Sequence, residues 1–444
     1  MKRVVGGVSA LVALALAGAG WAGGGATTTR VSVGSGGRQA NGSSSAASVS
    51  ADGRFVVFAS DASNLVHGDH NGVSDVFVRD LLRSTLQRVS VSSRGAEANG
   101  PSVSSSLDLV AGPSISADGR FVAFGSDASN LVADDTNGKE DCFVRDLKTH
   151  RTQRVSVSSS GAQGSGACLQ PAVSANGRYV AFVDSSRLVP AASGGVLELF
   201  VRDLKTHQTR LVSISSAGAI ANNASFRPSI SADGRWVAFE SFASNLVAGD
   251  TNGTTDVFLH DSTTGRTQRL SVTSAGAQAN GPSYAGVQPS ISLNGRYVVF
   301  YTDATNLVAG DTNASFDVMI RDLKNRTTRR VSVSSTGAQG DNASFLPSIS
   351  ADGRYVAFES SAANLTAGDS PGSDDVFIRD RQAGLTQRLG RTTGGGLDLL
   401  NQQYEHADIS SDGRYVAFAS MATHLVAGDT NGLEDVFVRG PLHP

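Results

Sequence analysis

The sequence has few cysteines, no strong excess of charge and, after its N-terminus, no long apolar run. Only two of its 444 residues are cysteines, so disulfide bridges cannot be the main source of stability. Aromatic residues make up only 6% of the chain. The formal net charge is −3, so the sequence shows no basic surface for nucleic acid or an anionic membrane. After residue 22, no apolar run approaches the ~18 residues that a membrane-spanning helix needs.

Sequence motifs of common chemistries are also missing. There is no Gly-x-Ser-x-Gly elbow, no phosphate-binding loop and no Cys/His metal framework. His67 and His70 flank Asp69, but no third or fourth ligand for a transition metal can be named beside them. We therefore predict no catalytic residues from motifs alone.

The N-terminus has the pattern of a secretory signal peptide. Lys2 and Arg3 precede an apolar stretch, and the Gly-Trp-Ala at 20–22 offers a cleavage site. We predict a signal peptide over residues 1–22 and one domain over 23–444, which is secreted or periplasmic. A retained N-terminal anchor is the alternative interpretation.

What the sequence does contain is a repeat. The phrase S-x-(D/N)-G-R-(F/Y/W)-V-(A/V)-F occurs seven times, with its glycine at 53, 119, 177, 234, 295, 353 and 413. A second phrase, of the type DVFVRD, follows each copy, at 75–80, 141–146, 198–203, 256–261, 317–322, 375–380 and 435–440. The glycines follow one another at intervals of 57 to 66 residues, and such a regular recurrence indicates a repeat architecture.

Each repeat predicts four strands. A short PSIS strand leads into an Asp-Gly or Asn-Gly hairpin turn, and YVAF, VFIRD and TQRVSVS segments follow, rich in β-branched and aromatic residues. The YVAF segment is apolar on both faces and the last segment alternates, which is typical of inner and outer strands. We therefore predict an all-β, seven-bladed β-propeller of four-stranded antiparallel blades.

The seventh repeat stops after its third strand, at 435–440. Residues 27–33, TTTRVSV, read as the missing fourth strand at the other end of the chain. We expect this N-terminal strand to complete the last blade and to close the ring without exposed edges. The alternative is a degenerate repeat in a loose tail.

The repeat resembles the WD40-like repeat of TolB-type β-propellers. The shared features are S-x-D-G-R-(F/Y/W)-V-A-F, D-V-F-V-R-D-L and T-x-R-V-S, although Ala, Leu or Ser replaces the usual proline of the turn. The chain has no room for the separate α/β domain of TolB itself. The resemblance implies the fold and not a function, because such propellers serve as binding platforms, enzyme gates and lyase scaffolds.

The two cysteines leave two interpretations open. Cys142 occupies a position that is Val or Leu in other repeats, which fits a small buried thiol. A Cys142–Cys168 bridge is the alternative in an oxidising compartment.

Five long loops share the pattern D-x-N-x-x-x-D. Hard oxygen ligands at this spacing suit Ca²⁺, and the pattern resembles a shortened version of the calcium loops of integrin-type propellers. Plain Asn-Gly turns are the other interpretation, since Asp and Asn also cap turns. The tentative ligands are Asp69, Asn71, Asp75, Asp135, Asn137, Asp141, Asp250, Asn252, Asp256, Asp311, Asn313, Asp317, Asp429, Asn431 and Asp435.

Departures from the repeat mark a second candidate site. Phe226, Tyr284, Phe345 and Tyr404 precede the innermost strands predicted for their blades, near the channel mouth, and Glu405 and His406 follow Tyr404. These six residues are ligand-binding candidates, with packing between blades as the alternative.

From these features we predict a monomeric binding protein that presents a polar long-loop face to a protein or a cell-envelope polymer. The partner is not nucleic acid, and calcium is the tentative cofactor. The alternative is a polysaccharide lyase or hydrolase, which would need repeat-breaking acid and base residues in a pocket at the channel mouth.

Overall fold

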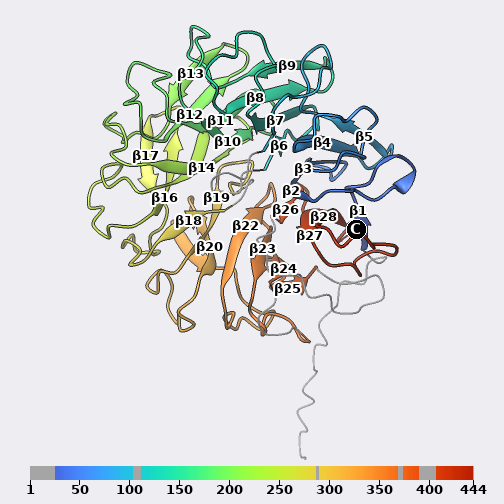
Figure 1. Ribbon diagram of the computed structural model, residues 1–444. Coiled ribbons are helices and arrows are strands. Elements are labelled where there is room, and N and C mark those ends of the chain that lie inside the picture. The colour runs from blue at the N-terminus through green and yellow to red at the C-terminus, as the bar shows by residue number, and fades with distance from the viewer. Residues whose placement is uncertain (1–25, 104–111, 287–289, 369–373, 390–406, 444) are drawn as a thin grey trace, which may run out of the picture.

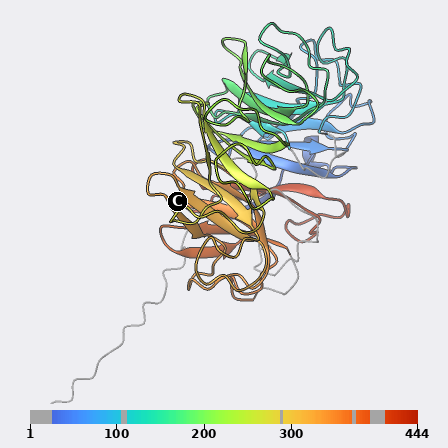
Figure 2. The same ribbon diagram turned by 90° about the vertical axis from the view of Figure 1, so that its left-hand side faces the viewer.

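Seven four-stranded antiparallel sheets stand around a central axis as the blades of a propeller (Figure 1 and, turned by 90°, Figure 2). This computed structural model describes residues 26–103, 112–286, 290–368, 374–389 and 407–443. The predicted signal peptide, residues 1–22, lies outside the described residues. None of the helices in the described part of the chain has the length and apolar character needed to span a bilayer.

The blades are numbered along the chain, and their strands are given from the axis outward. Blade 1 holds β2 (Ser44–Val49), β3 (Phe55–Ser60), β4 (Asp75–Asp80) and β5 (Thr85–Arg88), and blade 2 holds β6 (Ser114–Ile115), β7 (Phe121–Ser126), β8 (Asp141–Asp146) and β9 (Arg151–Arg154). Blade 3 holds β10 (Cys168–Val173), β11 (Tyr179–Asp184), β12 (Glu198–Asp203) and β13 (Gln208–Leu211), and blade 4 holds β14 (Ser225–Ile230), β15 (Trp236–Ser241), β16 (Asp256–Asp261) and β17 (Arg266–Arg269). Blade 5 holds β18 (Ser283–Ala285), β19 (Tyr297–Thr302), β20 (Asp317–Asp322) and β21 (Thr327–Arg330), and blade 6 holds β22 (Ser344–Ile349), β23 (Tyr355–Ser360), β24 (Asp375–Asp380) and β25 (Leu385–Arg388). Blade 7 holds β26 (Asp408–Ile409), β27 (Val416–Ser420), β28 (Asp435–Gly440) and, outermost, β1 (Thr27–Arg30).

The pairing of β1 with β28 confirms the predicted closure of the ring. Thr27 lies opposite Gly440 and Arg30 lies opposite Phe437 in the antiparallel register. The ladder continues beyond the strand, because the Val31 amide donates to the Val436 carbonyl at 2.7 Å. The last blade is therefore built from both ends of the described chain. One short 3-10 helix, η1 (Ser35–Gly37), follows β1.

Because neighbouring strands run antiparallel, the connections alternate between two faces of the ring. The hairpin turns after the first and third strands of a blade lie on one face, which we call the short-turn face. The connections after the second and fourth strands lie on the other, the long-loop face. Each blade therefore repeats the same four loops around the axis, and a site on one face draws residues from loops far apart in sequence.

The hydrophobic core is divided among the seven blade interfaces. The inner strands are buried on both sides, as predicted: Val56, Val57 and Phe58 of β3 have no exposed surface. One apolar cluster fills each gap between neighbouring blades. Inside a blade, the second and third strands stack a phenylalanine pair, such as Phe58 and Phe77 with ring centroids 5.8 Å apart.

Aromatic side chains also link each blade to the next at the hairpin turns. The residue after the turn arginine lies against the turn glycine of the following blade, as Tyr179 does against Gly234. A Cβ built on Gly234 would lie 2.2 Å from the Tyr179 ring, and the glycine has a φ of +72°. The contact runs around the whole ring, since Tyr415 of blade 7 packs on Gly53 of blade 1. Glycine is required here for both its backbone conformation and its lack of a side chain.

The two cysteines form a disulfide between blades 2 and 3. The Sγ atoms of Cys142 in β8 and Cys168 in β10 are 2.00 Å apart. Of the two interpretations that the sequence leaves open, the structure has the bridge. It joins neighbouring blades and not two strands of one sheet.

Candidate functional site

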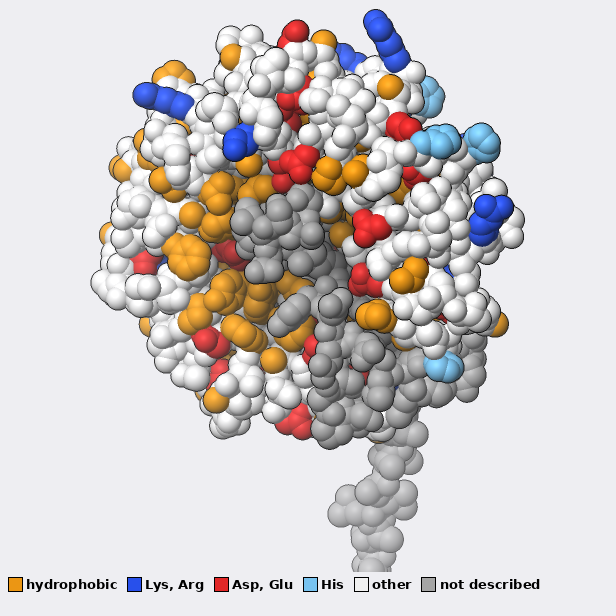
Figure 3. Space-filling view, in the orientation of Figure 1, with side chains coloured by type: hydrophobic (Ala, Val, Ile, Leu, Met, Phe, Trp, Pro, Cys, Tyr) orange, Lys and Arg blue, Asp and Glu red, His pale blue; other side chains and the backbone are white. Residues whose placement is uncertain are grey.

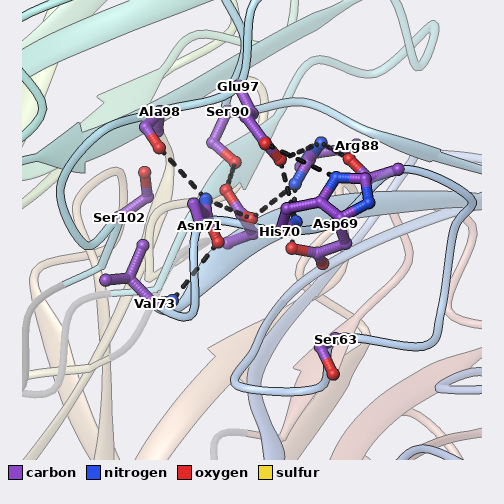
Figure 4. Close-up of polar contacts among 12 residues, drawn as sticks. Ser63, Asp69, His70, Asn71, Val73, Arg88, Ser90, Glu97, Ala98 and Ser102 are labelled. Atoms are coloured by element: carbon purple, nitrogen blue, oxygen red, sulfur yellow. Dashed lines mark hydrogen bonds and ion pairs between the residues drawn. The ribbon is translucent and has the colours of Figure 1, made fainter.

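The five D-x-N-x-x-x-D loops are each centred on an arginine. In blade 1, Arg88 Nη1 lies 3.1 Å from Asp69 Oδ1 and 3.0 Å from Asp75 Oδ2, and Arg88 Nη2 lies 2.8 Å from Glu97 Oε2 (Figure 4). The other four loops repeat this arrangement with an arginine from the outer strand of their blade: Arg154 with Asp135 and Asp141, Arg269 with Asp250 and Asp256, Arg330 with Asp311 and Asp317, and Arg30 with Asp429 and Asp435.

The loop asparagine does not present its oxygen to the space between the carboxylates. Asn71 Nδ2 donates to Asp75 Oδ2 at 2.9 Å and to the Ala98 carbonyl at 3.1 Å (Figure 4). Its Oδ1 accepts from the Val73 amide at 3.2 Å. The asparagine therefore closes its own turn and ties the loop to the next connection.

Other side chains donate to several of these carboxylate oxygens as well. Ser90 donates its hydroxyl to Asp75 Oδ1, and in blade 7 Ser32 donates to Asp435 Oδ1 at 2.5 Å. In blades 2, 4 and 5 a glutamine Nε2 bridges the two aspartates, as Gln278 does to Asp250 at 3.0 Å. These aspartates thus have fixed donors and a fixed internal cation.

As arranged, the loops do not form a calcium cage. A divalent ion between the carboxylates would have to displace the guanidinium, and the oxygen ligands that it needs already accept hydrogen bonds. No group of three or more His, Cys, Asp or Glu side chains suited to a metal is present among the described residues. Calcium binding stays a prediction, and titration decides it.

Blade 3 supports this interpretation of the loops, because it lacks the whole arrangement at once. Leu211 stands in place of the arginine and Ile220 in place of the glutamine, and the D-x-N pattern is absent. Leu211 and Ile220 lie instead in the apolar cluster of the blade 2–blade 3 interface, near Leu188. The first carboxylate, the amide, the glutamine and the arginine are all replaced in blade 3, while Glu198 keeps an acidic side chain at the second position and accepts from Ser193 instead.

The second candidate site lies on the long-loop face, at the mouth of the channel. Phe226, Tyr284 and Phe345 share one register position, opposite Glu240, Tyr301 and Glu359. The prediction that they precede the innermost strands is wrong, since they lie inside β14, β18 and β22. These strands begin earlier than the PSIS phrase because a bulge lengthens β14 and β22. The other three candidates, Tyr404, Glu405 and His406, lie outside the described residues.

The bulge places an uncommon backbone conformation beside the channel. Arg227 has a φ of +49° and Gln170, at the same position in blade 3, has a φ of +54°. The Arg227 amide donates to Gln170 Oε1 at 2.7 Å, so the two bulges are joined across the blade interface. Left-handed residues other than glycine cost free energy and cluster at binding and catalytic sites.

Arg227 is the centre of a polar group that the repeat does not explain. Its Nη1 donates to Tyr301 Oη at 2.7 Å, and its Nε lies 3.8 Å from Glu240 Oε1. Glu240 Oε2 accepts from the Ala285 amide at 3.0 Å. Burial raises the pKa of Glu240, although the charge of Arg227 opposes this shift. Burial likewise raises the pKa of Tyr301.

Aromatic rings surround this polar group on blades 4 and 5. Tyr284 stacks on Tyr301 with centroids 5.2 Å apart, and Phe316 meets Tyr301 edge-on at 5.7 Å. Phe226 meets Phe242 edge-on at 6.3 Å, and Phe242 is 49% exposed. On the face shown in Figure 3, hydrophobic side chains gather around the centre of the ring, with acidic side chains among them. We call Phe226, Arg227, Glu240, Phe242, Tyr284, Tyr301 and Phe316 the mouth cluster.

Of this cluster, the sequence analysis identified only Phe226 and Tyr284. Glu240 and Tyr301 were missed because they end a phrase, YVAF-x, that is otherwise uniformly apolar. Comparison of that last position among the repeats would have found them, since blades 1, 2, 3 and 7 have Ala59, Gly125, Val183 and Ala419 there.

A buried carboxyl at the other end of the channel was also missed. Asp408 lines a cavity of about 60 Å³ on the short-turn side, with Ser48, Ser114 and Ser229. Asp408 stands where blade 3 has Ala172 and the other five blades have serine, and its Oδ2 accepts from the Val49 amide at 2.7 Å. Complete burial raises its pKa to about 7. It fastens blade 7 to blade 1.

Comparison with known proteins confirms the fold and no more. No protein-family model matches the sequence, and no curated protein is similar in sequence. Solved structures that resemble this one include an oligogalacturonate lyase in complex with manganese (TM-score 0.55, 12% identity, 94% of this chain and 96% of that chain). The β-propeller domain of the Trilobed protease from Pyrococcus furiosus is also similar (TM-score 0.51, 12% identity, 90% of this chain and 93% of that chain). TolB from Acinetobacter baumannii matches at a TM-score of 0.40 and 15% identity, over 88% of this chain and 82% of that chain.

Proposed function

We propose that this chain is an exported binding protein that holds its ligand at the mouth cluster, on the long-loop face of blades 4 and 5. The observation that supports this is the local loss of the repeat. Glu240 and Tyr301 stand where blades 1, 2, 3 and 7 have small or apolar residues, and Arg227 stands where blades 1 and 6 have Ala46 and Leu346. Blade 6 has Glu359 and blade 3 has Gln170 at these positions, but blades 4 and 5 bring an arginine, a glutamate and a tyrosine together next to partly exposed aromatic rings. A purely structural ring has no need for blades that differ at its mouth.

The chemistry of the cluster suits a protein or a cell-envelope polymer. Exposed aromatic faces offer large contact area with little loss of conformational entropy, and they pack on side chains or on the C–H faces of sugars. Arg227 adds hydrogen-bond donors whose direction is fixed by Tyr301 and by the bulged backbone. This preorganisation lowers the entropy cost of binding.

Export is supported by the N-terminal signal pattern and by the Cys142–Cys168 bridge, because disulfides persist in oxidising compartments. We propose that the protein is secreted or periplasmic and monomeric.

The test is a capture experiment with three baits. The wild type, the double variant Phe242→Ala/Tyr284→Ala, and the control Leu82→Ala are each incubated with the native secretome and cell-envelope fractions. Leu82 is 76% exposed in the β4–β5 turn of blade 1, so its truncation removes apolar surface on the other face. We expect the wild type and the control to retain the same ligand and the double variant to lose it. Equal retention by all three baits would exclude the mouth cluster as the site.

One observation favours an enzyme as the second candidate. Glu240 is a buried carboxyl with a raised pKa, within reach of an arginine and a tyrosine at the channel mouth, and general acids have this kind of environment. A lyase or hydrolase would release unsaturated or reducing ends from a polysaccharide. Glu240→Gln should then abolish turnover and leave binding intact, whereas a binding protein shows no turnover in either form.

A further inference from the structure

A basic groove on the outer side of the ring runs between blades 4 and 5, away from the mouth cluster. It is formed by the outer strand β17 of blade 4 and by the hairpin turns of blade 5, and its volume is about 760 Å³. Six cationic side chains and no carboxylate are among the described residues that line it. The cations are Arg235, Arg266, Arg269, Arg321, Lys324 and Arg326.

Three of these cations have structural partners. Arg235 pairs with Asp261 at 2.7 Å, and Arg269 belongs to the loop arrangement described above. Arg321 Nη1 donates to the Thr273 carbonyl at 3.1 Å and to Thr328 Oγ1 at 2.9 Å, which joins blade 5 to blade 4. These side chains explain the packing of the interface.

The other three cations, Arg266, Lys324 and Arg326, have no such role. All three are exposed, and none forms an ion pair within the described part of the chain. Burial first and repulsion from Arg326 second lower the pKa of Arg321, so Arg326 adds positive charge close to an existing cation. Asp261 and Asp322, beside the groove, pair with Arg235 and Arg296, so the three exposed cations add positive charge to the groove in a protein whose net charge is −3.

Arg326 also occupies a position that suits glycine. Its φ is +55°, and blades 4 and 6 have Gly265 and Gly384 at this point of the turn. An arginine in the left-handed region costs about 1–2 kcal/mol relative to glycine. Blades 1, 2 and 3 have Ser84, His150 and His207 in the same conformation, so the turn accepts several residue types and the arginine at the edge of the groove is not required by the turn.

The corresponding groove between blades 2 and 3 has Arg120, Arg151, Arg178 and Lys205, but Asp146 also lines it. Between blades 3 and 4 the same sequence positions are less basic. Gln208 replaces Arg266 at the start of the outer strand, and Thr263 and Thr264 stand in the turn that carries Lys324 and Asn325 in blade 5. The repeat therefore tolerates neutral residues at these positions, and the cations are not needed to build a blade.

We propose that the groove between blades 4 and 5 binds an acidic polysaccharide through Arg266, Lys324 and Arg326. Guanidinium and ammonium groups bind the carboxylate or sulfate groups of such a chain. Gln268, Ser274 and Asn294 line the same groove and offer hydrogen bonds to sugar hydroxyls.

A single-stranded nucleic acid fits the groove less well. Its bases would need exposed aromatic faces for stacking. The one aromatic residue among the lining residues, Trp236, has Arg235 over its ring at 4.5 Å and packs against Gly295. The groove thus offers charge and hydroxyl-binding groups and no stacking platform.

The test compares the wild type with Arg266→Gln/Lys324→Gln/Arg326→Gly and with a control that loses three other exposed arginines, Arg38→Gln/Arg83→Gln/Arg94→Gln. Both variants lose the same charge, and the Arg326→Gly change restores the residue that blades 4 and 6 use, so the fold is retained. The probes are alginate for carboxylates, heparin for sulfates and a single-stranded oligonucleotide, and binding is measured by calorimetry at ~50 mM and ~500 mM salt.

We expect the groove variant to bind alginate or heparin about tenfold more weakly than both the wild type and the control. High salt should weaken binding of the wild type, and the probe that binds identifies the anionic group. The proposal is overturned if the wild type binds neither polysaccharide, if the control loses as much affinity, or if the oligonucleotide binds more tightly. The groove does not depend on the proposed function, and Phe242→Ala/Tyr284→Ala should keep full affinity for the same probe.

Discussion

Arg88 and its four counterparts supply the positive charge at the centre of the five D-x-N-x-x-x-D loops. Each guanidinium neutralises two aspartates that lie six residues apart, and each comes from the outer strand of the same blade. Arg30 does this for blade 7, although it lies at the other end of the sequence from Asp429 and Asp435. The loop and the closing strand of the ring are therefore held by the same ion pairs.

Removal of one such arginine should be costly. Arg269→Ala leaves Asp250 and Asp256 without their cation, and breaking a buried pair on one side typically costs more than the pair contributes. We expect a loss of about 2–4 kcal/mol in the free energy of unfolding, measured by urea denaturation. Arg151→Ala, an exposed arginine at the start of β9, should change it by less than about 0.5 kcal/mol. Similar values for the two variants would contradict the arginine-centred loop.

Calcium should have no place in the wild-type loops. A ligand that binds only the folded state stabilises it by about 2.7 kcal/mol per site at a hundredfold excess over Kd. Because the guanidinium occupies the space between the carboxylates, we expect the same Tm with chelator and with about 10 mM calcium. A Tm that rises with calcium concentration would show that the ion displaces the arginines.

Asp408 should make stability depend on pH. Its pKa in the folded state is about 7, against 3.8 for the ordinary group, so the folded protein holds a proton that the unfolded chain releases. Stability from this group is complete below pH 4 and is lost as the pH rises through 7. We expect Asp408→Asn to have little effect on the free energy of unfolding at pH 4 and to raise it by roughly 1–3 kcal/mol at pH 8. Parallel pH profiles for the variant and the wild type would exclude this role.

The hairpin turns carry much of the contact between neighbouring blades. Each presents a glycine with positive φ to an aromatic ring of the blade before it, so one turn serves both its own hairpin and the interface. The turn glycine is thus constrained twice, once by its backbone and once by the ring that covers it. Gly95, Gly161 and Gly276 meet only the first constraint, because their φ is positive and nothing lies within 4 Å of the position that a Cβ would take.

Two glycine substitutions separate these constraints. In Gly234→Ala the new Cβ meets the Tyr179 ring at 2.2 Å, while Gly276, with a φ of +91°, has nothing within 4 Å of its position. We expect Gly276→Ala to cost about 1 kcal/mol for the backbone alone and Gly234→Ala to cost about 3 kcal/mol or more. Thermal denaturation of both variants measures the difference. Equal losses of stability in the two variants would mean that the Tyr179 ring can move away from the new Cβ without strain.

The seven interfaces form a closed cycle, and β1 completes it. Deletion of residues 26–33 should expose β28 as a free edge and remove Arg30 and Ser32 from the aspartates of blade 7. We expect this variant to aggregate or to melt without a cooperative transition in calorimetry.

A permutant tests whether the strand or its covalent connection matters. Residues 26–33 are moved behind residue 444, and the chain begins at residue 34. Since Thr27 lies opposite Gly440, a short linker can deliver the strand to the same place. Cooperative melting of the permutant with failure of the deletion confirms closure by β1. A deletion variant as stable as the wild type would exclude it.

The fold could be predicted because the same sequence pattern for turns and strands recurs in every blade. The turn glycine, the apolar second strand and the alternating outer strand appear in each copy. The segment 27–33 matches the fourth strand, which only the seventh copy lacks. The candidate site was harder to predict from the sequence. Asp69 and Asp75 are close in sequence, but the arginine between them comes from another strand, and spacing alone does not reveal it. Arg227 lies at a bulge that recurs in β2, β10 and β22, and the alternation of polar and apolar residues does not reveal this bulge or that its residue meets Glu240.

The pairing of β1 with β28 also decides how the molecule responds to mechanical force. Thr27 lies opposite Gly440, so the chain enters and leaves blade 7 at one corner. A pull between these two points loads the antiparallel ladder from its end, and its hydrogen bonds break one after another instead of together. Traction on one end alone leaves the ladder unloaded. A pull between Thr27 and Gly440 should therefore open the ring at lower force than a pull along the strands of blade 7, because only one hydrogen bond is loaded at a time.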